Sequence, residues 1–415
     1  MLDKRNYMNE LVAGIDLCDE YTQISCGDEE QIWTFPTVLC RHKTAETWSV
    51  GEDAYARTLS GEGNLTDKLV KLVLKDGTAT LDGKRYPAEE LLLLFLERVL
   101  QIVQKELGQT ESFAGLTFTV RSLDERLVQV LYSCGEKLGV SKENIRVIGH
   151  SESFIYYMLS QKKEIWNGTV GMFDLSEEEL RYYEMKVQRG LKKNAVLAEY
   201  KRIEESFSLD ILETPSGAKL GDKILCTCAE RLMQRKLYSA VFLMGKGFEK
   251  REWAEDFMKL LCTKRRVYME TAVFAKGAAY CAADYLRPQT SYPYAMICEG
   301  RLKATVTMEV LFKGQEKEVT LAAVGDSWRN MGAMLEVIPE KQNAVELEIT
   351  RFDSKKKKAV TIMLEGFPKR PEKTTKVRIE ITFLDEKTMR VTLTDRGFGE
   401  LFPASDAKVV QEVML

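Results

Sequence analysis

The first part of the chain alternates short apolar runs with amphipathic segments, a pattern typical of layered α/β domains. Residues 11–26 predict a buried strand that turns back into a second strand. Residues 86–107 predict a helix, with Pro87 in its first turn and Gly108 at its end. Further strands are expected at 115–120, 145–149, 169–175 and 240–245, and further helices at 124–139, 151–161, 221–236 and 274–286.

The pattern changes after Arg287-Pro288. From Tyr294 onward, apolar and polar residues alternate with almost no helical periodicity, which predicts an antiparallel β-domain. The intervening stretch 288–293 is rich in Pro, Ser, Thr and Tyr and is the best linker candidate. We therefore expect one domain over residues 1–287 and a second over residues 288–415.

Composition excludes some classes of function. The 415 residues suit two or three domains, and 60 basic against 63 acidic side chains leave a formal net charge of −3. A nucleic-acid-binding domain would usually be strongly basic, so no nucleic-acid partner is expected. The longest apolar run, Leu91 to Leu96, is too short for a membrane span, and the chain starts without an apolar signal region. A cytoplasmic location is the expectation.

The nine cysteines are scattered, mostly within apolar patterns, and are expected to be reduced core residues. Cys226 and Cys228 are the one tight pair. They have no second pair and no nearby histidine, so no metal site is expected there.

Two strands that end in Asp-Leu carry a family resemblance. Gly14-Ile15-Asp16-Leu17 resembles the first phosphate loop of the actin and sugar-kinase superfamily, and VGMFDL (170–175) lies where the second phosphate loop belongs. Other segments resemble heat-shock chaperones of the DnaK type in order and spacing: TFPTVLC, WSVGEDAYA, YPAEELLLLFLERV, VFLMGKGF, FAKGAAYCAA and, in the second domain, EVIPEKQNAVELEITRF. The resemblance covers nearly the whole chain. It implies an actin-like ATPase fold, with duplicated ribonuclease-H-like halves, followed by a β-sandwich.

The two phosphate loops depart from the family. Residues 18–22 (CDEYT) stand where the family has Gly-Thr-Thr, and residues 176–179 (SEEE) stand where it has a glycine run and a threonine. Carboxylates at these positions would repel a polyphosphate, at a cost of about 1 kcal/mol for each contact at ~4 Å even in water. A large helical lobe between Gly221-Asp222 and the adenosine loop is also reduced to about twenty residues. By the same comparison, no helical lid is expected after the sandwich.

The remaining catalytic candidates are vestigial. Asp16 and Asp174 are either anchors for magnesium-bound water or strand-end carboxylates that cap neighbouring turns. His150 stands where the resemblance places a catalytic glutamate. Lys68 and Lys71 are candidates for the family's catalytic lysine, and a solvated helix face explains them equally well.

By the same resemblance, Gly14, Gly245, Gly247 and Gly277 are the candidate nucleotide-binding glycines. The two glycines of the adenosine loop, Gly245 and Gly247, are interpreted first as turn glycines.

In the second domain, Leu335, Ile338, Val345 and Leu347 correspond to the part of the chaperone sandwich that holds an extended apolar peptide. One interpretation is that these residues face the core, as alternation requires of any sandwich. The other is that Ile338 and its neighbours form an exposed groove for a partner strand.

The preferred hypothesis is a non-catalytic, chaperone-like binding or scaffold protein that has lost ATP hydrolysis, needs no cofactor or metal, and contacts a protein or peptide partner through the sandwich. The alternative is a divergent chaperone-like ATPase that binds Mg-ATP with Asp16 and Asp174. A polymer-forming, actin-like cytoskeletal protein is a third hypothesis, and the sandwich and the reduced lobe argue against it.

Overall fold

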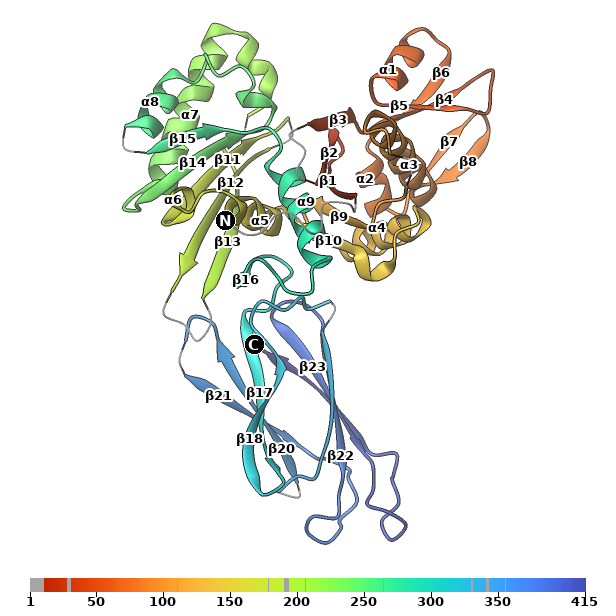
Figure 1. Ribbon diagram of the computed structural model, residues 1–415, viewed down its shortest axis with the longest axis vertical. Helices are drawn as coiled ribbons and strands as arrows, with labels where there is room; N and C mark the ends of the chain where they lie inside the picture. The colour runs from red at the N-terminus through yellow and green to blue at the C-terminus, as the bar shows by residue number, and fades with distance from the viewer. Residues whose placement is uncertain are drawn as a thin grey trace. The chain divides into compact units, whose positions relative to one another are not determined.

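The structure is a computed structural model that describes residues 11–27, 31–109, 111–177, 179–189, 194–205, 207–263, 265–329, 331–340, 343–354 and 356–415. The chain divides into two compact units (Figure 1). The first consists of residues 1–188 and 197–293, and the second of residues 189–196 and 294–415. The expected boundary between residues 287 and 288 lies shortly before the division between residues 293 and 294.

The first sheet of unit 1 has the strand order β10-β9-β1-β2-β3. Strand β1 is the central strand, antiparallel to β2 and parallel to β9, which is in turn parallel to β10. Two helices with apolar faces, α3 and α4, pack their buried side chains into the core of this sheet. The bounds are β1 (Val12–Leu17), β2 (Tyr21–Cys26), β3 (Ile32–Pro36), α3 (Ala88–Glu106), β9 (Gly115–Val120), α4 (Glu125–Lys137), η1 (Lys142–Asn144) and β10 (Ile145–Gly149).

A small group of elements between β3 and α3 forms two minor sheets, one of three strands in the order β5-β4-β6 and one of two strands, β7-β8. Their bounds are β4 (Leu39–His42), β5 (Trp48–Val50), α1 (Gly51–Leu59), β6 (Gly63–Thr66), α2 (Leu69–Leu74), β7 (Thr78–Leu81) and β8 (Lys84–Pro87).

The second sheet of unit 1 has the order β15-β14-β11-β12-β13. Its central strand β11 is antiparallel to β12 and parallel to β14. The bounds are α6 (Lys163–Trp166), β11 (Thr169–Leu175), β12 (Leu180–Gln188), β13 (Ala195–Ile203), η2 (Leu209–Glu213), α7 (Pro215–Met233), β14 (Tyr238–Met244), η3 (Lys246–Phe248), α8 (Glu255–Cys262) and β15 (Arg266–Met269). The predicted helix 221–236 therefore begins earlier, at Pro215, because the Thr214 hydroxyl accepts a hydrogen bond from the Gly217 amide and caps the helix.

Helices α5 (His150–Ser160) and α9 (Val273–Tyr285) cross in the middle of unit 1, and α9 runs between the two sheets (Figure 1). Two glycines permit this packing. A Cβ atom on Gly14 would lie 2.1 Å from the amide nitrogen of Ala279, and one on Gly277 would lie 1.9 Å from the carbonyl oxygen of Ser153. Any side chain at either position would push α9 away from β1 or α5.

Unit 2 is built from two four-stranded sheets, β18-β17-β20-β21 and β19-β22-β23-β24, which enclose one apolar core. The pairings in both sheets are antiparallel. The bounds are β16 (Ala295–Ile297), β17 (Ala304–Phe312), β18 (Gln315–Ala322), β19 (Gly332–Val337), β20 (Ala344–Arg351), β21 (Lys357–Met363), β22 (Val377–Phe383), β23 (Thr388–Asp395) and β24 (Lys408–Met414). Among the described residues, no helix is both long enough and apolar enough to cross a membrane.

Candidate functional site

The two central strands of unit 1, β1 and β11, both end in Asp-Leu, and both aspartates are buried. Asp16 is 0% exposed and Asp174 is 3% exposed. Burial raises the pKa of Asp174 to about 7; the positive charge of Arg121 opposes this shift and the negative charge of Asp16 adds to it. The Oδ2 atom of Asp16 and the Oδ1 atom of Asp174 have no hydrogen-bond partner in the described part of the chain.

His150, the first residue of α5, contacts Asp16 directly. Its Nε2 atom donates a hydrogen bond to Asp16 Oδ1 over 2.8 Å, and its Nδ1 atom lies 3.4 Å from the Tyr183 hydroxyl. The ring stacks on Phe274 of α9, with 3.8 Å between the ring centroids. Burial lowers the pKa of His150, although the Asp16 carboxylate opposes this shift. The imidazole is therefore neutral near pH 7 and serves as a hydrogen-bond donor to Asp16.

A group of arginines neutralises the carboxylates next to the two aspartates. Glu179 directly precedes β12. Its carboxylate lies 2.5 Å from Arg181 Nε, 3.1 Å from Arg202 Nε and 3.7 Å from Arg121 Nη1. Arg121, which directly follows β9, also lies 3.8 Å from Glu20. Glu20 and Glu179 thus form ion pairs with three guanidinium groups of the same chain.

In the first loop, residues 18–22, the Asp19 side chain contacts α2 of the same unit. The Asp19 Oδ1 atom accepts hydrogen bonds from the backbone amides of Val70 and Lys71, at 2.9 and 3.1 Å. The Lys71 ammonium lies 3.9 Å from Asp19 Oδ2, so this candidate lysine pairs with the loop itself. Lys68 is exposed and adopts a left-handed conformation (φ 54°) at the start of α2.

The second loop is closed by its own backbone and side chains. The Ser176 amide donates to the Glu179 carbonyl over 3.0 Å, and Glu177 pairs with Lys246. Glu178, one of the three predicted carboxylates, lies outside the described residues. Gly245 has φ 95°, and a Cβ atom there would lie 2.4 Å from the carbonyl oxygen of Leu175.

The other candidate glycines also have packing roles. A Cβ atom on Gly247 would lie 2.4 Å from the Leu175 side chain. Gly14 and Gly277 face the backbones of α9 and α5, as described above. In each case atoms of the chain itself occupy the space beside the glycine.

The structure therefore brings three of the candidates together, Asp16, Asp174 and His150. Lys71 pairs with Asp19, and Lys68 is exposed at the start of α2. Sequence reasoning missed the arginines. Arg121 directly follows the predicted strand 115–120, and this position was the one sign in the sequence that it lies near Asp16. No comparable sign marks Arg181 or Arg202.

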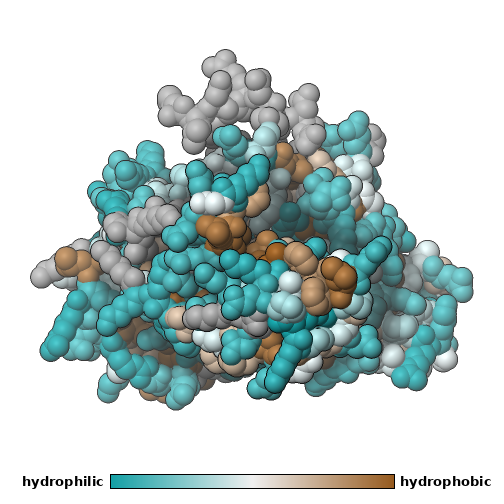
Figure 2. Space-filling model, turned by 90° about the horizontal axis from the view of Figure 1, so that it is seen from below, coloured by the Kyte–Doolittle hydropathy of each residue, from teal (hydrophilic) through white to brown (hydrophobic). Residues whose placement is uncertain are grey.

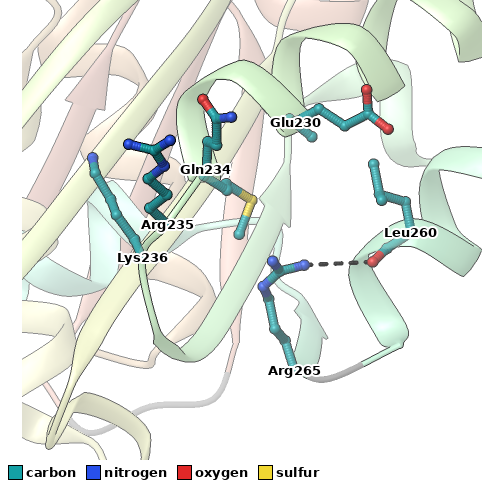
Figure 3. Close-up of a pocket in the computed structure, with 8 residues that line it drawn as sticks. Glu230, Gln234, Arg235, Lys236, Leu260 and Arg265 are labelled. Carbon is teal, nitrogen blue, oxygen red and sulfur yellow. Dashed lines mark hydrogen bonds between the residues drawn. The ribbon is translucent and has the colours of Figure 1, made fainter.

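A separate cavity of about 410 Å³ lies at the ends of α7 and α8 and contains none of the candidate residues. Its lining includes Glu230, Gln234, Arg235, Lys236 and Arg265, and Figure 3 shows the Arg265 guanidinium directed at the carbonyl oxygen of Leu260, 3.4 Å away. The end of α8 therefore has a cation beside one of its carbonyl groups.

The four candidate partner-binding residues of unit 2 differ in accessibility. Val345 and Leu347 are buried in the sandwich core, and Leu335 is half-buried against it. Ile338 follows β19 and is 45% exposed. Of the four, Ile338 is the most exposed.

Comparison with known proteins identifies the sequence family. Residues 20–299 match a family model described as "Family of unknown function (DUF5716) C-terminal", and residues 301–415 match a domain of unknown function, DUF8552. Because the first match covers more than half of the chain, the protein belongs to the DUF5716 family. No curated protein matches the chain.

Proposed function

We propose that this protein is a non-catalytic, chaperone-like binding or scaffold protein of the cytoplasm, in which a DnaK-type, actin-like domain works without nucleotide. The observation that carries the proposal is the internal neutralisation of the cluster around Asp16 and Asp174. Carboxylates that would have to face magnesium and phosphate are instead matched by Arg121, Arg181 and Arg202 and by the His150 hydrogen bond.

Phosphate binding in such a loop needs free backbone amides and an anion-compatible field. Here the Asp19 carboxylate of the first loop faces the Val70 and Lys71 amides of α2, and in the second loop the Ser176 amide donates to the Glu179 carbonyl. Magnesium would also need ionised carboxylates. A pKa of about 7 leaves Asp174 half-protonated at neutral pH, which disfavours magnesium.

The partner is proposed to bind at one end of the sandwich, which we call the loop end. Antiparallel pairing places the end of β17, the start of β18, the start of β20 and the end of β21 together. In the other sheet it places the end of β19, the start of β22, the end of β23 and the start of β24 together. The connections β19–β20 and β21–β22 join these two edges, so all of these loops share the same end of unit 2.

The loop end carries exposed apolar side chains that nothing in the described part of unit 2 covers. Leu401 is 87% exposed and Leu311 is 74% exposed. The full set is Leu311, Phe312, Ile338, Met363, Phe398 and Leu401. Figure 2 views the molecule from the bottom of Figure 1, and apolar side chains lie there in separate groups among polar ones. An extended apolar segment of a protein partner would contact several of these groups at once.

A buried ion pair and its hydrogen bonds fix the position of the loop between β23 and β24. The Arg370 guanidinium and the Asp395 carboxylate form two hydrogen bonds of 2.7 Å each, and both side chains are almost fully buried. Asp395 also accepts hydrogen bonds from the amides of Gly397 and Ser405, at 3.0 and 2.9 Å. The loop that presents Leu401 is therefore ordered before a partner arrives, which lowers the entropic cost of binding.

The test is a panel of extended apolar peptides against the full chain. Leu401→Glu and Ile338→Glu should each weaken binding at least about tenfold, because burial of a leucine or isoleucine is worth roughly 1.5–3 kcal/mol. Met414→Glu is the matched control, since Met414 is exposed at the far end of β24. Binding that is lost equally in the control, or no peptide binding at all, would contradict the proposal.

A second candidate function, a divergent ATPase, is favoured by the retention of Asp16 and Asp174 at the ends of the two central strands. It predicts tight MgATP binding that requires Asp174.

A further inference from the structure

Three buried side chains around the end of β1 have the donor atoms of a transition-metal site. They are Asp16 and Cys18, two residues apart on the chain, and His150 at the start of α5. The candidate ligand atoms all lie within 4.8 Å of one another. Cys18 Sγ is 3.8 Å and His150 Nε2 is 2.8 Å from the same atom, Asp16 Oδ1.

A second observation points to a missing ligand. Asp16 Oδ2 is fully buried and finds no hydrogen-bond partner among the residues that the structure describes, and the same holds for Asp174 Oδ1. A buried carboxylate oxygen without a partner is costly, and a bound cation would satisfy it.

Binding of a divalent ion would displace the Cys18 thiol proton to solvent, so that the sulfur ligates as a thiolate.

The surroundings of His150 suit a metal ligand. When Nε2 binds a metal, Nδ1 carries the ring proton and can donate it to the Tyr183 hydroxyl, 3.4 Å away. Stacking on Phe274 fixes the plane of the ring. A partner on the second nitrogen is the usual companion of a histidine that ligates a metal.

We propose that Asp16, Cys18 and His150 bind a zinc-class divalent ion, with the fourth position open to water. Thiolate and imidazole ligands select zinc or its neighbours and disfavour magnesium, which prefers oxygen ligands alone. Tetrahedral zinc places such donor atoms about 3.3–3.6 Å apart, so the present spacing needs shifts of roughly 1 Å or less. The proposal is independent of the proposed function, because a structural ion here neither requires nor excludes a partner at the sandwich.

The direct test uses the full chain, stripped of metal by unfolding with a chelator, refolded, and titrated with Zn²⁺ or Co²⁺. We expect one equivalent to bind, with a thiolate-to-cobalt charge-transfer band. X-ray absorption of the zinc form should show one sulfur ligand at about 2.3 Å and two or three lighter ligands at about 2.0–2.1 Å. These measurements need no variant, so a folding defect cannot obscure them.

Variants then identify the ligands. Cys18→Ser should remove the charge-transfer band and weaken zinc binding at least about 100-fold, whereas Cys134→Ser, a buried thiol of α4, should change neither. His150→Gln should weaken binding to a similar extent. A wild-type zinc shell without sulfur, zinc binding no tighter than a millimolar constant, or a band that survives Cys18→Ser would each overturn the proposal.

Discussion

The substitution Asp174→Asn should stabilise the protein, in contrast to most substitutions of buried residues. In the folded state the pKa of Asp174 is raised from 3.8 to about 7, chiefly by burial. The native state therefore binds a proton that the unfolded state has already released between about pH 4 and pH 7. Stability is lost as the pH rises through this window and stays low above it.

The size of the effect follows from the shift. A difference of about three pH units corresponds to up to about 4 kcal/mol, the penalty of an ionised Asp174 at pH 8 relative to pH 4. Asparagine keeps the shape and carries no charge, so Asp174→Asn should raise the unfolding free energy by up to about 4 kcal/mol at pH 8. It should have little effect near pH 4.

The assay is urea unfolding of metal-free protein at several pH values between 4 and 8, followed by tryptophan fluorescence. Trp328 is replaced by Phe, so that the remaining four tryptophans report on unit 1; they are Trp33, Trp48, Trp166 and Trp253.

Asp222→Asn is the control with the opposite sign. The Asp222 carboxylate accepts hydrogen bonds from the Asp256 and Phe257 amides at 2.9 and 2.8 Å. Asparagine keeps one acceptor oxygen and turns its NH2 group toward the other amide, which should cost about 1 kcal/mol at neutral pH. The reasoning is refuted if Asp174→Asn destabilises the protein at pH 8, or if its effect does not change with pH.

Two further predictions concern packing. Arg370→Gln leaves the buried Asp395 carboxylate without its cation and should destabilise unit 2 by about 3–5 kcal/mol. Urea unfolding followed by fluorescence measures this loss in a chain whose other four tryptophans are replaced by Phe, so that Trp328 alone reports; a loss below about 1 kcal/mol would show that the pair is dispensable. Gly277→Ala should lower the melting temperature, although alanine favours helices by roughly 1 kcal/mol, because its Cβ atom would meet the Ser153 carbonyl oxygen; an unchanged or raised melting temperature would contradict the close contact.

Local pattern was sufficient to predict most of the secondary structure. The strands expected at 115–120, 145–149 and 169–175 coincide with β9, β10 and β11, and the predicted helix 86–107 contains α3. These elements have a clear apolar period and identifiable ends. The start of α7 was missed, because Thr214 and Pro215 define it and they lie outside the apolar pattern.

The contacts around Asp16 and Asp174 join residues that are far apart in the chain. Asp16 and His150 are separated by 134 positions, and no spacing rule predicts their hydrogen bond. Arg181 and Arg202 lie on strands with ordinary alternation, where a surface arginine and an arginine of a charge cluster look alike. Gly14 and Gly277 were considered for a nucleotide because local sequence does not reveal that a helix backbone lies against them.

The central claim is that the actin-like domain works without nucleotide. Calorimetry with MgATP, on the full chain freed of transition metals, tests it most directly. Because the cluster supplies its own counter-ions, we predict no binding tighter than about 1 mM, where the total binding free energy is only about −4 kcal/mol. A micromolar dissociation constant, or ATP turnover that Asp174→Ala abolishes, would contradict the account and support the ATPase alternative.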